Sequence, residues 1–204
     1  MTDALPTLKE ADALRADIYR LLATLLRQPP DTELLDWLAE LAIEQDGSRL
    51  AECWQSLAVA ANGANTEGLQ RAHFRHLVGV IQGEVVPYAS WYRNGELMEA
   101  ALVALRQDLK VLGFERSEHT RDPEDHLAAL CEVMAMLIDA ESSEQGYFFS
   151  QHLAPWAASC FADLGQVDTA FYAALGQLGS AFMESEQARL SVDAGHTPVR
   201  IVEP

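Results

Sequence analysis

The sequence predicts an all-α protein, a single-domain bundle of about eight to ten helices. Apolar residues recur at spacings of three and four along most of the 204-residue chain, which is the period of one helix face. Prolines, glycines and capping side chains interrupt this pattern at intervals typical of short helices. The alternation of strands and helices that builds a parallel sheet is missing. We therefore expect a helical domain over residues 1–194 and a flexible tail over 195–204.

The first part of the chain has the pattern of four helices. The first ends before Pro29 and Pro30, because the residue before a proline avoids helical geometry. Asp31 is suited to cap the second, which we expect to end near Asp46. A polar break at 62–65 separates the third from the fourth. The apolar sides of these helices are expected at 14–25, 34–41, 49–61 and 66–77.

Residues 78–95 depart from the helical period. This stretch, VGVIQGEVVPYASWYRNG, combines three glycines, a proline and β-branched clusters, and we interpret it as an ordered loop. It also carries the large aromatic residues Tyr88, Trp91 and Tyr92. Such residues either line a binding surface or fill the space between helices, and the pattern is compatible with both.

Helical patterning resumes at Glu96 and ends at Gly113. After a polar hinge, the run Asp122-Pro123-Glu124-Asp125 predicts a helix start, with Asp122 as the N-cap and Pro123 at the first helical position. The apolar stripe of that helix continues to Ile138. Further helices are expected at 147–153, from 155 and from 168.

The charge balance narrows the class of partner. Fourteen basic and 31 acidic residues give a formal net charge of −17. Such a chain lacks the basic surface that binds nucleic acid, and an anionic membrane would repel it. A basic partner is favoured, although solubility alone is the simplest alternative. The chain has no signal peptide pattern and no apolar run of bilayer length, so we expect a cytoplasmic protein with no integral membrane segment.

Motifs of catalysis and cofactor binding are missing from the sequence. There is no phosphate-binding glycine motif, no nucleophile motif and no paired CxxC, so we expect neither an enzyme nor a bound cofactor. His73 and His76 could share a metal ion, but a third ligand is not evident, so no metal is expected. Asp125 and His126 could transfer a proton. The alternative is that the acids cap a helix and His126 anchors the hinge.

Three segments resemble the TorD/DmsD family of cytoplasmic redox-enzyme maturation chaperones. They are Val86-Pro87-Tyr88-Ala89-Ser90-Trp91-Tyr92, Asp122-Pro123-Glu124-Asp125-His126-Leu127 and Phe149-Ser150-Gln151-His152-Leu153-Ala154-Pro155-Trp156. The N-terminal pattern Ile18-Tyr19-Arg20-Leu21-Leu22-Ala23 is also similar but less specific. Together these motifs span residues 18–156.

The resemblance implies a TorD-like chaperone of molybdoenzyme maturation in anaerobic respiration. Such a protein binds the twin-arginine signal peptide of an apo-molybdopterin oxidoreductase of the dimethyl sulfoxide reductase class, and assists cofactor insertion and folding before export by the Tat pathway. It can contact the Tat or cofactor-biosynthesis machinery, and is a monomer or a segment-swapped dimer. The alternative is an assembly adaptor of the nitrate-reductase type, which binds a molybdoenzyme that is not exported. The implied peptide-binding residues are Tyr88, Trp91, Tyr92, Pro123, Glu124, Asp125, His126 and His152.

Overall fold

The computed structural model describes residues 8–44, 46–115 and 122–194. Within these ranges the regular elements are helices, and a single isolated β-bridge joins Tyr88 to His126, which confirms the predicted all-α class. The predicted tail at 195–204 lies outside the described residues. The α-helices are α1 (Leu8–Arg27), α2 (Thr32–Ala39), α3 (Arg49–Asn62), α4 (Thr66–His73), α5 (Ala89–Asn94), α6 (Ala100–Val111), α7 (Leu127–Asp139), α8 (Gln145–Phe148), α9 (Ala157–Leu164) and α10 (Ala170–Ala194). The two π-helical turns are η1 (Phe74–Val78) and η2 (Phe149–Leu153).

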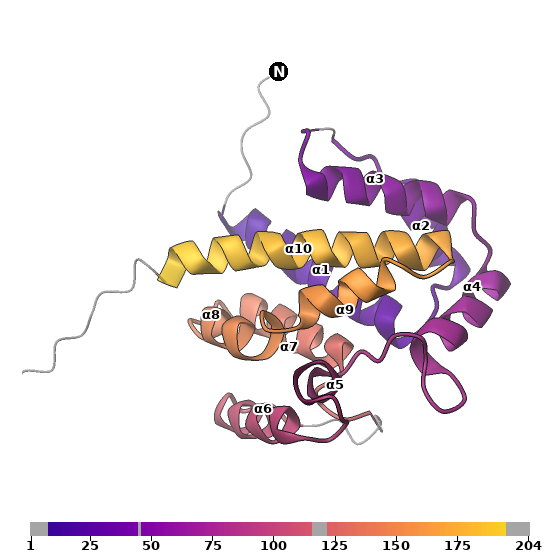
Figure 1. The fold of residues 1–204 in the computed structure, drawn as a ribbon. Helices are drawn as coiled ribbons and strands as arrows, with labels where there is room; N and C mark the ends of the chain where they lie inside the picture. The colour runs from indigo at the N-terminus through magenta and orange to yellow at the C-terminus, as the bar shows by residue number, and fades with distance from the viewer. Residues whose placement is uncertain (1–7, 45, 116–121, 195–204) are drawn as a thin grey trace, which may run out of the picture.

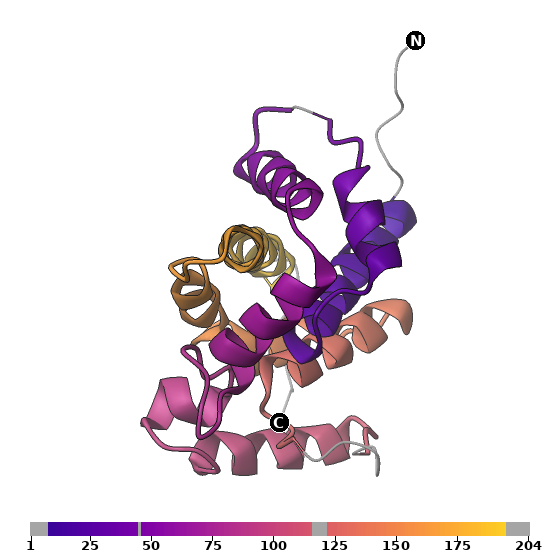
Figure 2. The same cartoon turned by 90° about the vertical axis from the view of Figure 1, so that its right-hand side faces the viewer.

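The long helix α10 forms the centre of the bundle. It packs between α3 and α9, and Figure 2 looks nearly along its axis with these two helices on either side. Helix α1 lies behind α10 in Figure 1 and packs along α7. The small helices α5 and α6 pack on each other at one end of the bundle, below α9 in Figure 1. The core between these helices is built from leucines, phenylalanines and alanines on the predicted apolar faces.

Capping side chains set several helix starts, and the cap at Asp31 is the one that the sequence predicts. Asp31 accepts a hydrogen bond from the backbone N–H of Leu34 at 2.9 Å at the start of α2. Ser48 and Asn65 do the same for α3 and α4. Helix α2 ends at Ala39, before the expected Asp46, since two turns already bury its inward leucines.

Three further predicted boundaries are wrong, and these three lie near the loop region. The stretch 78–95, expected to be a loop throughout, contains the short helix α5. The helix expected from Glu96 begins at Ala100, because Met98 has a φ of +64° and interrupts the helical geometry. The helix expected to start at Asp122 begins at Leu127, and its N-cap is His126. The acids before it belong to a tertiary contact described below.

A buried ion pair joins the first helix to the last. The Nε and Nη2 atoms of Arg15 on α1 each donate a 2.6 Å hydrogen bond to the carboxylate of Glu186 on α10, across 171 residues of sequence. The Tyr19 hydroxyl donates to the same carboxylate at 3.0 Å. Both charged side chains are almost fully buried. Such a pair is costly to break, because removal of one partner leaves a buried charge alone.

The three cysteines are packed inside the fold. Cys53, Cys131 and Cys160 are buried free thiols. Among the described helices, none is both long and apolar enough to cross a membrane.

Candidate functional site

An antiparallel β-bridge brings two of the sequence motifs together. The backbone N–H of Leu127 donates to the carbonyl of Pro87 at 2.8 Å, and that of Ala89 donates to the carbonyl of Asp125 at 3.0 Å. These bonds place Tyr88 directly opposite His126. Two of the three motifs that carry the family resemblance thus form one continuous piece of structure.

Asp125 is fully buried in this contact and caps the neighbouring helix. Its Oδ2 atom accepts hydrogen bonds from the backbone N–H of Ser90 at 2.9 Å and from the Ser90 hydroxyl at 2.6 Å. Helix α5 has no capping bond from its own N-cap side chain, so the Asp125 carboxylate supplies the acceptor and the favourable negative charge from another segment. None of the Asp125 side chain is exposed.

The same serine fixes the turn before α6. The Ser90 hydroxyl donates its proton to Asp125 and accepts a hydrogen bond from the backbone N–H of Met98 at 3.1 Å. Met98 holds a φ of +64°, a left-handed conformation that a non-glycine residue rarely adopts without support. A chain of hydrogen bonds therefore runs from the buried acid to a strained surface turn.

His126 caps α7 in its neutral form. Its Nδ1 atom accepts a hydrogen bond from the backbone N–H of Ala128 at 3.0 Å, which leaves the proton on Nε2. Burial lowers the pKa of His126 to about 4, against the attraction of Asp122. Its ring packs edge-on against Tyr88, with ring centroids 4.9 Å apart. Of the two roles considered for Asp125 and His126, these bonds match capping and anchoring, because each side chain has its own structural partner.

Glu124 is also engaged within the chain. Its Oε2 atom accepts hydrogen bonds from Nε and Nη2 of Arg106 on α6, at 3.1 and 2.8 Å. Only 16% of its side chain is exposed. This carboxylate, expected to pair with an arginine of a peptide, already holds an arginine of its own chain and ties α6 to the 122–126 segment.

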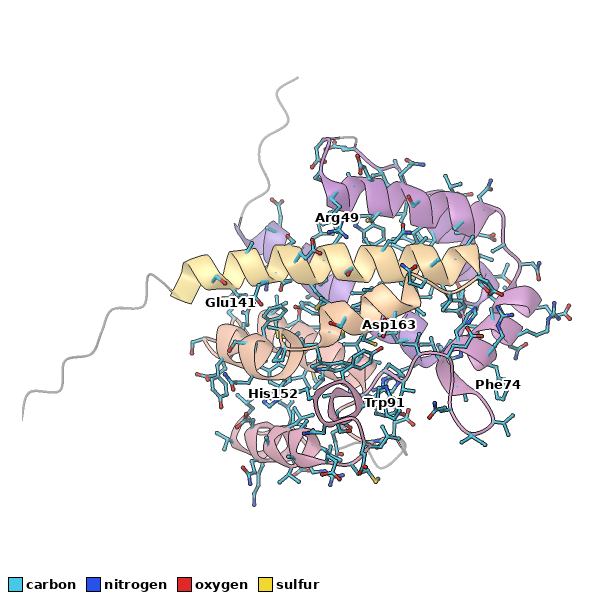
Figure 3. The ribbon with its side chains drawn as sticks, in the orientation of Figure 1. Arg49, Phe74, Trp91, Glu141, His152 and Asp163 are labelled. Atoms are coloured by element: carbon cyan, nitrogen blue, oxygen red, sulfur yellow. The ribbon has the colours of Figure 1, made fainter. Side chains whose placement is uncertain are left out.

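The three aromatic residues of the loop divide between the two expected roles. The Tyr92 hydroxyl donates to Asp163 on α9 at 2.6 Å, and its ring stacks on Trp156, so it fills the space between helices. Trp91, on the same helix, is 37% exposed, and Figure 3 shows it on α5 below Asp163. Tyr88 is half-buried and its ring faces His126.

His152 is a buried structural residue. Its Nε2 atom lies 2.7 Å from Oδ2 of Asp108, and its backbone carbonyl accepts a 2.6 Å hydrogen bond from Nε1 of Trp156. Burial lowers the pKa of His152, although the hydrogen bond and charge of Asp108 oppose this. The third sequence motif therefore forms a packed corner that joins η2 to α6.

A cavity of about 290 Å³ opens beside the β-bridge. Its walls come from the end of α1, the 77–88 loop, the Leu97–Met98 turn and the 122–126 segment. Tyr88, Pro123 and His126 line it, whereas the other predicted site residues do not. A larger cavity, of about 520 Å³, lies between α4 and the start of α10, but it is lined by no residue of the three motifs. A cavity of about 340 Å³ is lined by Phe149, Leu153 and Ala154 of the third motif, but by none of the predicted peptide-binding residues. We therefore take the cavity of about 290 Å³ as the candidate site and call it the bridge groove.

Four apolar side chains of the bridge groove were missed in the sequence. Val78, Ile81, Leu97 and Met98 line it, and each has about half or more of its area exposed. For Val78 and Ile81 the available signal was their position in a segment without helical period, where an apolar residue has no helix face on which to be buried. Leu97 and Met98 gave no such signal, because they were expected in the helix that begins at Glu96.

Charged groups occupy one end of the bridge groove. Arg27 lines it and is held by Glu132 through two hydrogen bonds of 2.8 Å. Asp122 also lines it, half-exposed, with its Oδ2 at 3.9 Å from Nη1 of Arg27. Because Arg27 has its stronger partner in Glu132, the Asp122 carboxylate keeps capacity for a further cation. Within the described ranges, no group of three or more histidine, cysteine or acidic side chains is placed to hold a metal ion.

Comparisons with known proteins show what the chain is similar to. The family described as "Nitrate reductase delta subunit" matches residues 43–162. The Tat proofreading chaperone DmsD of Salmonella paratyphi A is 28% identical over 169 residues, which cover 80% of this chain and 79% of the relative. The chaperone protein TorD of Actinobacillus succinogenes is 25% identical over 159 residues, with 76% and 80% covered.

A solved structure shares the fold. The crystal structure of a candidate redox enzyme maturation protein from Archaeoglobus fulgidus aligns with a TM-score of 0.54 at 16% identity, and covers 90% of this chain and 98% of the other. The family match spans both motifs that meet at the β-bridge and extends over more than half of the chain. The chain therefore belongs to the nitrate reductase delta subunit family, the TorD-like family whose motifs it carries.

Proposed function

We propose that this protein is a cytoplasmic chaperone of redox-enzyme maturation that binds the twin-arginine signal peptide of a molybdopterin oxidoreductase of the dimethyl sulfoxide reductase class. It holds that enzyme until its cofactor is inserted and export can proceed. The observation that carries the proposal is the convergence of two family motifs on the bridge groove, through the Tyr88–His126 bridge. The relatives named as Tat proofreading and TorD chaperones support it. No catalytic step is part of this function.

We use the lining of the bridge groove to divide the eight expected peptide-binding residues into two groups. Tyr88, Pro123 and His126 line the groove, and Trp91 is partly exposed on α5, the helix that follows Tyr88, so we assign these four to peptide contact. Glu124, Asp125, Tyr92 and His152 are bonded inside the fold, and we assign them to positioning. The Nε2–H of the neutral His126 is suited to donate a hydrogen bond to a peptide carbonyl.

A twin-arginine signal combines basic and apolar character, and the groove offers a counterpart to each. Asp122 stands half-exposed at one end, and the chain carries a net charge of −17, which speeds the approach of a basic peptide. An exposed ion pair contributes only about 0–1 kcal/mol, so burial of apolar side chains must supply most of the affinity.

Calorimetric titration with a twin-arginine signal peptide tests the proposal. A twin-lysine peptide serves as the matched control, and each titration is repeated at two salt concentrations. We expect saturable binding that weakens with lysine and with salt, because lysine lacks the bidentate geometry and salt screens the charges. The absence of binding by either peptide would contradict the proposal.

A second candidate is an assembly adaptor of the nitrate-reductase type, favoured by the description of the matched family. Such an adaptor would bind the N-terminus of a molybdoenzyme that remains in the cytoplasm. Parallel titrations with an N-terminal peptide of that kind and with the twin-arginine peptide separate the two candidates, since the tighter of the two complexes identifies the class of client.

A further inference from the structure

A short loop beside the bridge groove carries the two most exposed large apolar side chains of the described residues. Val80 is 93% exposed and Ile81 is 97% exposed. Phe74 and Val78, on the adjoining η1 turn, are each half-exposed, and Figure 3 shows Phe74 at this edge of the molecule. A contiguous group of exposed apolar side chains of this kind marks an interaction surface more often than a chance exposure.

The backbone of this loop is tightly constrained. Gly79 has a φ of +66°, and a Cβ atom there would lie 2.0 Å from the carbonyl oxygen of Gln82. A Cβ atom on Gly83 would lie 2.5 Å from the carbonyl oxygen of His76. Only glycine permits such close approach of two backbone segments. The tip of the loop therefore has a defined shape that depends on both glycines.

Anchors on both sides hold the loop to the body of the protein. The backbone N–H of Gly79 donates to the Phe74 carbonyl at 2.6 Å, and that of Val85 donates to the His76 carbonyl at 2.8 Å. The buried His76 ring lies with Nδ1 2.6 Å from Glu84 and Nε2 2.8 Å from Thr169. These contacts connect both ends of the loop to η1 and to the start of α10. A surface ordered in advance loses little conformational entropy when a partner binds.

A second apolar wall of the bridge groove comes from another segment. Val78 and Ile81 of the loop line the groove, and so do Leu97 and Met98 of the turn before α6. Met98 is 67% exposed, and the hydrogen bonds of Ser90 and Asp125 hold its backbone in place. The bridge groove thus has two apolar walls, each fixed by its own hydrogen-bonded support, and His126 lines it as well.

We propose that these two walls form an apolar clamp that grips the uncharged, apolar segment of the bound signal peptide, with Ile81 as a specificity-determining residue. This assignment rests on the proposed function. The volume of about 290 Å³ lies at the lower limit of small-ligand sites, so it has room for a few side chains of a peptide and none for a folded domain. Asp122 marks the end of the clamp toward which the basic residues of the peptide are directed.

Charge argues for a peptide occupant over a second copy of this chain. Two copies would each bring a net charge of −17 to the contact, and their mutual repulsion opposes association. A segment that is apolar and flanked by arginines meets no such repulsion. The clamp therefore has a partner whose chemistry is complementary in both its apolar and its charged parts.

Ile81→Asp tests the clamp in the full chain, with Val59→Asp on α3 as the control. Val59 is also exposed, at 63%, and the substitution changes the net charge equally, but Val59 does not line the bridge groove. We expect the dissociation constant of a twin-arginine peptide to rise about tenfold with Ile81→Asp, because one buried aliphatic side chain contributes that much. Val59→Asp should bind as the wild type does. Both variants should keep the wild-type circular dichroism spectrum, since both side chains are at the surface.

A second peptide, in which serines replace the apolar segment, shows which part of the peptide Ile81 meets. If the clamp is correct, wild-type protein binds this peptide more weakly, and Ile81→Asp has little further effect on it. Equal affinity of wild type and Ile81→Asp for the unmodified peptide would overturn the clamp while the proposed function stands. Failure of the wild type to bind either peptide would refute the proposed function and the clamp with it.

Discussion

The Oδ2 atom of Asp125 accepts two hydrogen bonds from Ser90, one from its backbone N–H at 2.9 Å and one from its hydroxyl at 2.6 Å. Through this pair, a residue of the 122–126 segment determines where α5 begins. The Ser90 hydroxyl in turn accepts a hydrogen bond from the backbone N–H of Met98, which lines the bridge groove. A fully buried acid therefore shapes the surface of the site without reaching it.

Ser90→Ala should weaken both the fold and the peptide complex. The substitution leaves the Met98 N–H without a partner and removes one of the two hydrogen bonds that the Asp125 carboxylate accepts, which should lower the free energy of unfolding by about 1–3 kcal/mol. The loss of the Met98 support should also weaken peptide binding, although Ser90 makes no peptide contact. Urea unfolding and calorimetric titration measure the two effects. Ser56→Ala, at an exposed serine on α3, is the control and should change neither quantity.

Stability should fall in acid through His126. Burial lowers the pKa of His126 to about 4 from its usual 6.5, so between these values the unfolded chain takes up a proton that the folded chain does not. The free energy of unfolding should therefore decrease as the pH falls from about 6.5 to about 4, by up to about 3 kcal/mol from this residue. Urea unfolding at several pH values across this range measures the slope.

His126→Asn isolates that contribution. Asparagine can cap α7 as histidine does, but it does not titrate. The variant should show a shallower pH dependence, with the remaining slope due in part to His73 and His152, whose pKa values are also lowered by burial. Identical slopes for the wild type and the variant would show that His126 does not contribute.

Two glutamates on α10 should differ sharply in their effect on stability. Glu186→Gln removes the buried charge that binds Arg15 and should cost about 3–5 kcal/mol. Glu184→Gln breaks the ion pair with Arg49, in which both side chains are more than half exposed, and should cost about 0–1 kcal/mol. Thermal unfolding of both variants at the same pH gives the comparison. A similar loss in both would mean that the buried pair adds nothing beyond an exposed one.

Gly79→Ala should impair the site more than the helices. The added Cβ meets the Gln82 carbonyl and requires a positive φ, so the loop must change its shape. We expect peptide affinity to fall while the helical circular dichroism signal is kept, because the loop lies outside the α-helices. Gly47→Ala is the matched control, since Gly47 also has a positive φ but its Cβ would meet no neighbouring atom. Equal losses in peptide affinity from the two substitutions would argue against a specific role of the loop.

The parts of the fold set by local sequence were predicted well, and those set by distant partners were not. Asp31, Ser48 and Asn65 act on backbone groups three residues away, so local sequence determines the start of the helices they cap. Asp125 also caps a helix with its carboxylate, but it bonds to a serine 35 positions earlier in the chain. The pattern of neighbouring residues cannot predict a contact over that separation. The expected helix start at Asp122 failed for this reason.

In the candidate site, too, the residues within recognisable motifs were predicted, and the contacts between distant segments were not. Tyr88, Pro123 and His126 were identified through family motifs and do line the groove. Glu124 was expected to be available to a peptide, yet Arg106 on another helix engages it. Ile81 has no motif and no helical period, and its importance becomes visible only when the loop is placed beside the groove.

The Arg15–Glu186 pair also bears on how the protein is made. Its two partners are separated by 171 residues. At ordinary rates of protein synthesis, Glu186 is therefore made on the order of 10 to 30 s after Arg15. During that interval a nascent chain has a guanidinium group without its carboxylate and an apolar α1 face that α10 has not yet covered. Completion of the bundle is therefore a late event after most of the chain has left the ribosome, and a chain truncated before α10 should be recognised by proteases as unfinished.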